Sequence, residues 1–271
     1  MSNALVRDLK GVYTIWYRDL LRFFRDRSRI FGSLGMPLLF LIVFGSGFGG
    51  ALSNMGGATG SGLPFNFQQF MFPGILGMTV LFTSIMSALS IVWDREFGFL
   101  KEVLVAPVSR VAVALGKVAG GSTIAMIQGG IILLLAPLIG VKVSVLQIVY
   151  LLLLMLLLAM VMSSLGILLA ARQKSMEGFQ VIMQFVLMPM LFLSGAFFPI
   201  STSPDWMKAI MRINPVSYGV DVLRQVALSG SVPKQVLAGL SMTSVGFDVL
   251  VLAVFGVVFL VPAVLLFSKQ D

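Results

Sequence analysis

The sequence has 271 residues, of which 58% are hydrophobic and 11% are charged, and its mean hydropathy is +1.01. Soluble domains carry about 25% charged residues, so this composition excludes an ordinary water-soluble protein. The chain has no Cys and no His, which excludes disulfides, thiol nucleophiles and the commonest zinc and haem ligands. The net charge of +8 does not predict a nucleic-acid partner, because the basic residues flank apolar segments, where they orient helices and meet anionic lipid.

Residues 1–30 combine apolar side chains at helical spacing, beginning with Leu5 and Leu9, with interspersed basic residues such as Arg18 and Arg22. This pattern predicts an amphipathic helix that lies in the headgroup plane of a bilayer. The alternative is a solvated basic face that only sets topology. The stretch has no apolar core followed by a small-residue cleavage site, so we do not expect a cleaved signal peptide.

Six apolar runs follow, each long enough to cross a bilayer. They cover approximately residues 31–48, 70–93, 118–139, 146–171, 179–198 and 247–267. The uncharged interval from Ile30 to Trp93 contains the first two of them. The sequence therefore predicts an all-α polytopic membrane protein in which residues 1–271 form a single domain with six transmembrane helices.

The longest irregular region separates the fifth and sixth runs. An apolar series at helical spacing begins at Trp206, and Asn214 followed by Pro215 predicts an N-cap and first-turn proline for a second short helix ending near Leu228. Both pieces are too short and too charged to span a bilayer. We therefore expect residues 199–230 to form an amphipathic or re-entrant hairpin on the outer side.

The distribution of Lys and Arg predicts the orientation of the chain. Fourteen of these residues lie on the side of the two termini, and five lie on the opposite side of the predicted spans. Cytoplasmic loops carry the excess of positive charge. We therefore expect both termini in the cytoplasm and the protein in the cytoplasmic (inner) membrane of a prokaryote.

Ionisable groups are nearly absent from the predicted spans, and only Asp248 approaches one, at a position that we expect to be interfacial. Transporters driven by ion gradients usually need an intramembrane carboxylate, so this mechanism is disfavoured. The nearest approach to a nucleotide-binding loop, at Gly116 and Lys117, lacks the earlier Gly and the following Ser or Thr. We expect no ATP hydrolysis by this chain, so a partner must supply the energy for any active transport.

The charged segment 94–110 offers a surface for such a partner. Leu100, Val103 and Leu104 form an apolar stripe at helical spacing, and Pro107 ends the stretch. A short helix of this kind can dock in a groove of another protein. An ordinary loop that follows the positive-inside rule fits the spacing equally well.

Two motifs carry a resemblance to a known family. Residues 94–102 (Asp-Arg-Glu-Phe-Gly-Phe-Leu-Lys-Glu) and 104–110 (Leu-Val-Ala-Pro-Val-Ser-Arg) resemble the cytoplasmic signature of the type-2 ATP-binding-cassette (ABC) export permeases, which include drug-resistance and nodulation-factor exporters. Residues 193–199 (Leu-Ser-Gly-Ala-Phe-Phe-Pro), Trp206 and 213–218 (Ile-Asn-Pro-Val-Ser-Tyr) resemble the family's exit from the fifth span and its outer hairpin. One departure is Phe97, where many relatives carry a polar or basic residue.

The resemblance implies roles for particular residues. Segment 94–107 corresponds to the coupling helix that docks on the ATPase, which assigns transmission to Asp94, Arg95, Glu96, Gly98, Leu100, Glu102 and Pro107. By the same analogy spans two and five line the transport path, at Phe82, Phe185, Met188 and Phe192, although plain bundle packing explains these apolar side chains too. The hairpin residues singled out by the second motif are Pro199, Trp206, Asn214, Pro215 and Tyr218.

The resemblance also implies a non-enzymatic permease subunit with no cofactor of its own. Two copies of a separate cassette ATPase would bind ATP and magnesium, and the membrane part would be a dimer with a second copy or a close paralogue. Trp and Tyr are scarce in the spans, whereas Phe, Met and Leu dominate them, which favours a lipophilic drug, a lipid or a lipid-linked compound as cargo. The alternatives are export of a polysaccharide or glycolipid by the same architecture, a membrane scaffold or assembly factor, and, third, a channel.

Overall fold

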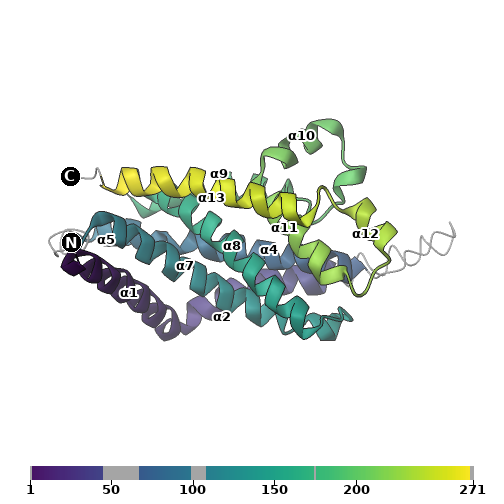
Figure 1. Cartoon of the computed structure of the whole chain (residues 1–271), viewed down its shortest axis with the longest axis horizontal. Coiled ribbons are helices and arrows are strands. Elements are labelled where there is room, and N and C mark those ends of the chain that lie inside the picture. Colours follow the sequence, from purple (N-terminus) through teal and green to yellow (C-terminus); the bar gives the residue numbers. More distant parts are fainter. Residues whose placement is uncertain (1, 45–66, 99–107, 174, 269–271) are drawn as a thin grey trace.

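The computed structural model describes residues 2–44, 67–98, 108–173 and 175–268, and this part of the chain contains helices and turns but no strand. The helices pack side by side in an elongated bundle (Figure 1). Their bounds are α1 Ser2–Arg25, α2 Arg27–Leu39, α4 Phe67–Ser87, α5 Leu89–Glu96, α7 Arg110–Leu133, α8 Val145–Ala170, α9 Met176–Phe192, α10 Asp205–Ile213, α11 Pro215–Leu228, α12 Lys234–Leu240 and α13 Val245–Ser268. The all-helical class predicted from the sequence is confirmed for the described residues.

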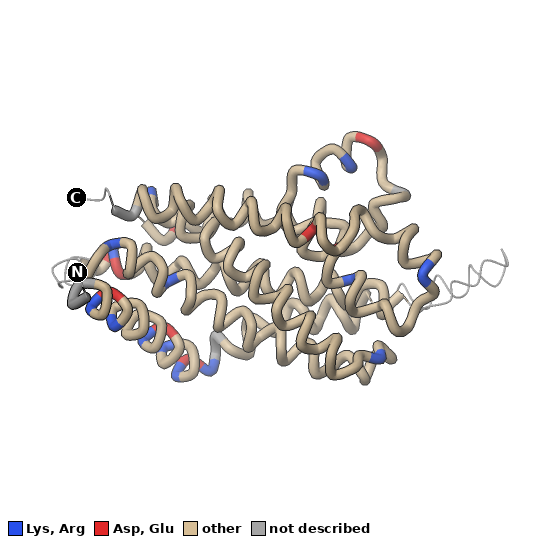
Figure 2. Tube along the Cα trace, viewed as in Figure 1, with Lys and Arg blue, Asp and Glu red and all other residues tan. Residues whose placement is uncertain are grey.

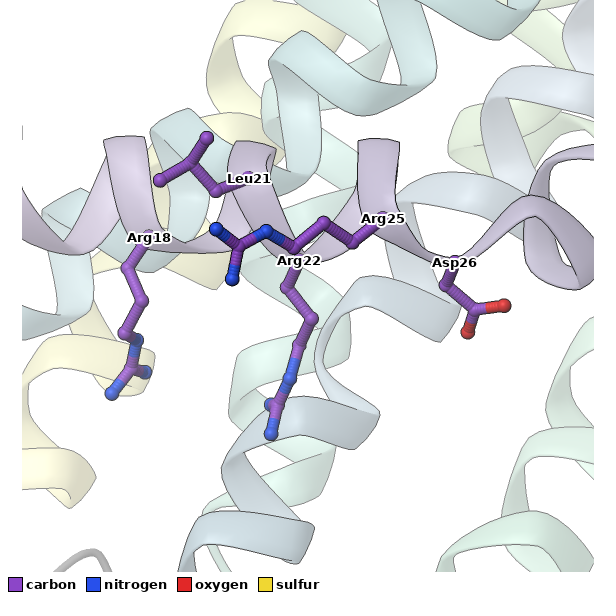
Figure 3. Close-up of a pocket in the computed structure, with 5 residues that line it drawn as sticks. All are labelled: Arg18, Leu21, Arg22, Arg25 and Asp26. Atoms are coloured by element: carbon purple, nitrogen blue, oxygen red, sulfur yellow. The ribbon is translucent and has the colours of Figure 1, made fainter.

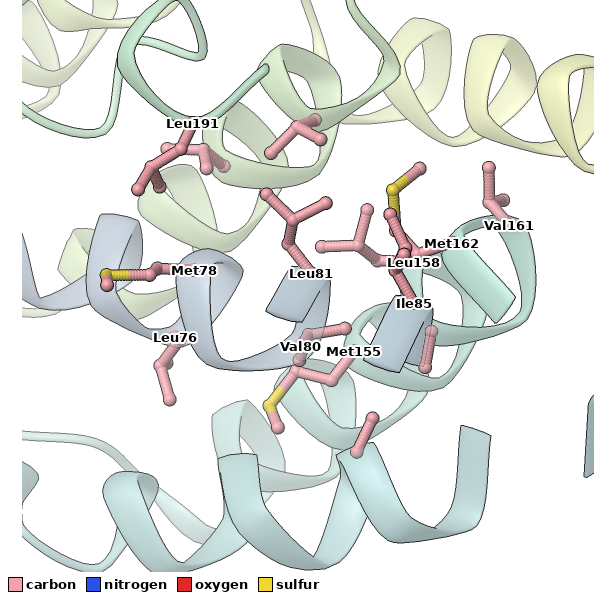
Figure 4. Close-up of a cluster of buried hydrophobic side chains, with 14 of the residues drawn as sticks. Leu76, Met78, Val80, Leu81, Ile85, Met155, Leu158, Val161, Met162 and Leu191 are labelled. Atoms are coloured by element: carbon pink, nitrogen blue, oxygen red, sulfur yellow. The ribbon is translucent and has the colours of Figure 1, made fainter. Parts of the chain in front are cut away.

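Helix α4 lies at the centre of the bundle, and its contacts with α7, α8 and α11 form the core. In Figure 4, Leu81 and Ile85 of α4 lie beside Leu158 and Met162 of α8. All four side chains are fully buried. The two helices therefore cover each other's apolar surface. This packing holds in place the end of α5 and the start of α7, which carry the candidate site.

Small residues allow the close helix contacts. A Cβ added at Gly74 of α4 would lie 2.7 Å from the backbone oxygen of Ala196, and one added at Gly166 of α8 would lie 3.0 Å from Cα of Ile85. Membrane helix interfaces are enriched in small residues because they let two backbones approach. Gly74 thus fixes where the segment after α9 meets α4.

Four helical runs in the described part are long and apolar enough to cross a bilayer: Phe67–Glu96, Arg110–Leu133, Val145–Ala170 and Lys234–Leu266. A fifth arises if α1 and α2, which are bent by 72°, form one broken span. Helix α9 is apolar but has only 17 residues. The structure therefore supports four to five candidate spans, and the count of six stays a prediction.

The boundaries of the spans differ in places from those predicted. Helix α7 begins at Arg110 rather than at 118, because the side chain of Ser109 caps it by accepting a hydrogen bond from the amide of Ala112. Helix α9 ends at Phe192 rather than at 198, and the chain then turns through Gly195, whose φ is +75°. The first predicted span corresponds to α2 and a π-helical turn, Phe40–Phe44, and its last four residues lie outside the described part.

The first turns of α1 and the last turns of α13 lie at the same end of the bundle, and α10 and α12 lie at the opposite end (Figure 1). Lys and Arg gather along α1 at the first of these ends, whereas α8 and α13 carry almost no charge (Figure 2). Helix α11, expected in a hairpin at the outer face, is instead almost fully buried against α4, α8 and α13.

Candidate functional site: the end of α5 and the coupling segment

The last three residues of α5, Asp94, Arg95 and Glu96, each contact a different part of the bundle. We call these three residues the α5 junction. They begin the predicted coupling helix, residues 94–107, which we call the coupling segment, so their contacts join its start to other helices. Leu100, Glu102 and Pro107 of the predicted coupling helix lie outside the described residues.

Asp94 joins α5 to α1 and α7. Its Oδ2 atom lies 3.0 Å from Nη2 of Arg18 and 3.3 Å from Nζ of Lys117, and its Oδ1 atom lies 3.9 Å from Nη1 of Arg22. Lys117 in turn lies 3.3 Å from Oδ1 of Asp19. The carboxylate is therefore held by cations from two helices while its own side chain is only 7% exposed.

Lys117 was predicted to lie in the charged loop before the third span, and this is wrong. It lies inside α7 and is buried, with Ser90 accepting its third hydrogen bond at 2.9 Å. A buried ammonium group is stable when each of its donors is paired. The partners, Asp19 and Asp94, are far from Lys117 in sequence, so loop-by-loop counting of charges misses them.

Arg95 joins α5 to the end of α8. Its Nη1 atom donates to the carbonyl oxygens of Ala170 at 3.4 Å, Ala171 at 3.1 Å and Gln173. The last carbonyls of a helix lack intrahelical partners and carry partial negative charge, so a guanidinium group there satisfies them. Arg95 thus acts as the C-terminal cap of α8.

Glu96 joins α5 to the start of α9. Its Oε2 atom accepts a hydrogen bond of 3.0 Å from the backbone amide of Met176, the first residue of α9. The first amides of a helix are free donors at the positive end of its dipole, so a carboxylate there is stabilising. Gly98 follows with φ +80°, a left-handed conformation that favours glycine, and lets the chain turn away from α5.

Helix α1 also contacts the other end of the coupling segment. Oδ1 of Asp8 accepts a hydrogen bond of 2.9 Å from the backbone amide of Ser109, at the start of α7. A Cβ added at Gly11 would lie 2.4 Å from Cγ1 of Val108. The Ser109 backbone and hydroxyl groups lower the pKa of the Asp8 carboxyl below its ordinary value. The two ends of the coupling segment are thus both fastened to α1.

The residues predicted to line a transport path are not gathered in one cavity. Phe185, Met188 and Phe192 share one face of α9, and this face is exposed, with Phe185 78% accessible. Phe82 lies on α4 and is half-buried against the core. Helix α9 contacts α4 and α5, so its other face is free to meet lipid or another subunit.

The predicted hairpin residues have distinct contacts. Asn214 caps α11 by accepting from the amide of Val216, and its amide group donates to the carbonyls of Met190 at 2.7 Å and Leu193 at 2.8 Å. The Tyr218 hydroxyl donates to the carbonyl of Arg212 at 2.6 Å. Pro215 begins α11 as predicted and is buried, Pro199 precedes a 3-10 turn, and Trp206 is exposed on α10.

A buried polar cluster at the α11–α13 contact was not predicted. Oδ2 of Asp221 accepts from the amides of Met242 and Thr243, and Gln225 donates to both Asp221 and Asp248 at 3.1 and 3.0 Å. Asp248 lies in the first turn of α13, at the end of the predicted sixth span, and its side chain is fully buried, which was not predicted. Asp221 and Arg224 lie three residues apart in α11, but nothing local in the sequence indicates that α13 brings Asp248 beside them.

Arg224 of α11 is the largest fully buried side chain of the described part. Its Nη2 atom donates to the carbonyl of Gly195 at 2.6 Å, and its guanidinium carbon lies 4.4 Å from the centre of the Phe70 ring. The Nε and Nη1 atoms of Arg224 have no hydrogen-bond partner among the residues that the structure describes. In the count of charges Arg224 was one of the five on the outer side, and its burial was not predicted.

A search for similar proteins identifies the family. The sequence profile of the family described as "ABC-2 type transporter" matches residues 10–228. The ycf38 protein of Cyanophora paradoxa is 28% identical over 218 residues, which cover 80% of this chain and 73% of that protein. The "Inner membrane transport permease YadH" of Escherichia coli K12 is 27% identical over 78% of this chain and 80% of its own length.

A third relative, "Nodulation protein J" of Rhizobium meliloti, is 26% identical over 79% of this chain and 80% of its own length. The matched region contains α4 and α5, the coupling segment and α11, so it includes both motifs that carried the resemblance in the sequence. The chain therefore belongs to the ABC-2 type transporter family and is a membrane subunit of the permease class.

Proposed function

We propose that this chain is the membrane-spanning permease subunit of an ATP-driven exporter, and that the coupling segment receives the force of a separate cassette ATPase. The observation that carries the proposal is the α5 junction. Its three residues connect the start of the coupling segment to α1 and α7 through Asp94, to α8 through Arg95, and to α9 through Glu96. A push on the segment would therefore move several helices together.

The functional unit in this proposal has two permease subunits and two ATPases, which bind ATP and magnesium. The exposed apolar face of α9, with Phe185 and Phe192, supports a second subunit, because close packing of side chains is one of the forces that join helices in lipid. The start of α1 and the end of α13 lie at the same end of the bundle, which fits an even number of crossings (Figure 1). The excess of basic residues at that end supports the part of the proposal that puts both termini in the cytoplasm.

The cargo in this proposal is a lipophilic drug, a lipid or a lipid-linked compound. The outward faces of α9 and α13 carry Phe, Met, Leu and Val rather than the Trp and Tyr that stack on sugar rings. Met side chains adapt to apolar ligands of different shape. The rival cargo is a polysaccharide or glycolipid, and a scaffold is the rival from another functional class.

The test uses the permease reconstituted in vesicles with its ATPase. Glu96→Ala removes the hydrogen bond that joins α5 to the first amide of α9, while Ser175 still caps that helix. We therefore expect ATP-driven transport to fall by about tenfold while basal ATP hydrolysis remains, because a charge-assisted hydrogen bond contributes about 1.5–3 kcal/mol. Glu177→Ala is the matched control, since Glu177 is an exposed carboxylate in the first turn of the same helix.

Equal transport by the parent, Glu96→Ala and Glu177→Ala would refute the role of the α5 junction. A scaffold is distinguished by a different result, in which the chain assembles with partners but moves no lipophilic probe when ATP is supplied. Stimulation of ATP hydrolysis by lipids and drugs, and not by soluble glycans, would support the proposed cargo class over the polysaccharide.

A further inference from the structure

A groove beside α1 has the chemistry of an anion site. Its volume is about 560 Å³, and it is lined by Arg18, Leu21, Arg22, Arg25 and Asp26 (Figure 3). In Figure 3 the side chains of Arg18 and Arg22 extend to the same side of the helix, and that of Arg25 lies along it. Three guanidinium groups thus border one open space that contains a single carboxylate.

The guanidinium groups of this arginine groove are not saturated by protein partners. Arg18 is committed to Asp94, but Arg22 lies 3.9 Å from that carboxylate, beyond hydrogen-bond distance, and its side chain is 51% exposed. Arg25 is exposed and makes no ion pair within the described part of the chain. Because each guanidinium carries five donors, the groove has donors free for an anion with several oxygens.

An exposed apolar stripe runs along α1 beside the arginines. One face of the helix is buried against α7 through residues such as Ile15 and Phe23. The stripe itself consists of Leu5, Leu9, Tyr13, Tyr17, Leu21 and Phe24, all exposed. Leu21 belongs to both the stripe and the groove, so an occupant of the groove meets cationic and apolar surface at once.

We propose that the arginine groove binds the phosphate of an anionic phospholipid, with Arg22 and Arg25 as the principal ligands and the acyl chains along Leu21 and the neighbouring stripe. A free phosphate ion would use the guanidinium groups but not the apolar stripe, and amphipathic helices with basic and apolar faces are the usual binders of anionic membranes. Since Arg18 and Arg22 also face Asp94, the bound phosphate lies next to the α5 junction. The site requires neither ATP nor a partner ATPase, so its test is independent of the proposed function.

The experiment measures lipid binding to the purified full-length chain in a neutral detergent, by native mass spectrometry and by titration. The probes are phosphatidylglycerol, phosphatidylcholine and inorganic phosphate. The test variant is Arg22→Gln/Arg25→Gln, and the control is Arg7→Gln/Lys10→Gln, which removes the same charge from exposed positions of the same helix outside the groove.

We expect the parent to prefer phosphatidylglycerol, and the test variant to bind it about thirtyfold more weakly, since each basic residue near an anionic surface contributes roughly fivefold. The control variant should keep at least half of the parent's affinity. If the double variant loses helicity by circular dichroism, Arg25→Gln alone, which breaks no ion pair of the described part, should still weaken binding about fivefold.

Four results would overturn the proposal. Equal affinity for phosphatidylcholine and phosphatidylglycerol would show that the charge of the headgroup does not determine binding. Equal losses in the test and control variants would show a diffuse surface charge rather than a site. Binding of inorganic phosphate as tight as that of the lipid, or a groove that binds no lipid and is instead needed to retain a protein partner, would assign it to a different ligand.

Discussion

Replacing Lys117 by Met should destabilise the protein by about 3 kcal/mol. The three donors of the ammonium group are all used, by Asp19 and Asp94 at 3.3 Å each and by Ser90 at 2.9 Å. Met retains the length of the side chain and its apolar packing but removes the charge. The substitution therefore isolates the electrostatic role of Lys117 in joining α1, α5 and α7.

The size of the effect depends on the ion pairs that the carboxylates of Asp19 and Asp94 keep when Lys117 is replaced. Breaking a buried ion pair costs about 3–5 kcal/mol, because the remaining charge is buried without compensation. The side chains of Asp19 and Asp94 are only 10% and 7% exposed, but Arg18 still lies 3.0 Å from Asp94 and 3.6 Å from Asp19. This partial compensation places the cost at the lower limit, which corresponds to a fall in Tm of roughly 6–12 °C.

The assay is thermal unfolding of the purified chain in detergent, followed by circular dichroism. Lys142→Met is the matched control, because Lys142 is exposed in the turn before α8, and it should change stability by less than about 0.5 kcal/mol. The double variant Lys117→Met/Asp19→Asn also removes one of the two uncompensated carboxylates, so it should regain about half of the lost stability. A Tm of Lys117→Met within 1–2 °C of the parent, roughly the shift for 0.5 kcal/mol, would refute the buried charge cluster.

Three further predictions concern packing, capping and pH. Gly74→Ala should cost about 1–3 kcal/mol in thermal unfolding, because the added Cβ meets the Ala196 backbone, whereas Gly130→Ala, which meets nothing within 4 Å, should be neutral or slightly stabilising. Asn214→Ala removes the α11 cap and two bonds to the end of α9, so Tm should fall by an amount corresponding to about 2–3 kcal/mol. Because the pKa of Asp8 is lowered in the folded protein, its contribution to stability is complete above the ordinary Asp pKa and is lost as pH falls through the lower folded value. The variant Asp8→Asn should therefore show a smaller fall of Tm in acid than the parent. An identical dependence of Tm on pH in the two proteins would contradict this prediction.

The long uncharged helices were predictable, because an apolar run of this length indicates a membrane-spanning helix. The predicted spans at 146–171 and 247–267 differ from α8 and α13 by one or two residues at each end. Asn214 followed by Pro215 also marked the start of α11, since a capping side chain and a first-turn proline act within a few residues of each other. Local chemistry of this kind can be read from the sequence directly.

The beginning of α7 was less predictable, because Lys117 interrupts its apolar pattern. Hydropathy treats a lysine as a loop residue, and the predicted span therefore started at 118 instead of Arg110. The structure stabilises Lys117 in the helix through Asp19 and Asp94, which come from two other helices. Such compensation depends on tertiary packing, so it leaves no local signal.

The same principle explains why the buried cluster of α11 and α13 was missed, and it limits what the scarcity of charge in the spans can exclude. Asp221, Arg224 and Asp248 each look like loop or interface residues when read one at a time, yet all three are fully buried. Each charge is partly compensated, because Asp221 accepts from backbone amides, Asp248 accepts from Gln225, and Arg224 donates to a carbonyl of the segment after α9. An argument against ion-coupled transport that rests on counting carboxylates in apolar runs therefore loses force here. The argument for an external energy source rests instead on the family and on the α5 junction, where one short helix end joins four helices beside the segment that a partner would press.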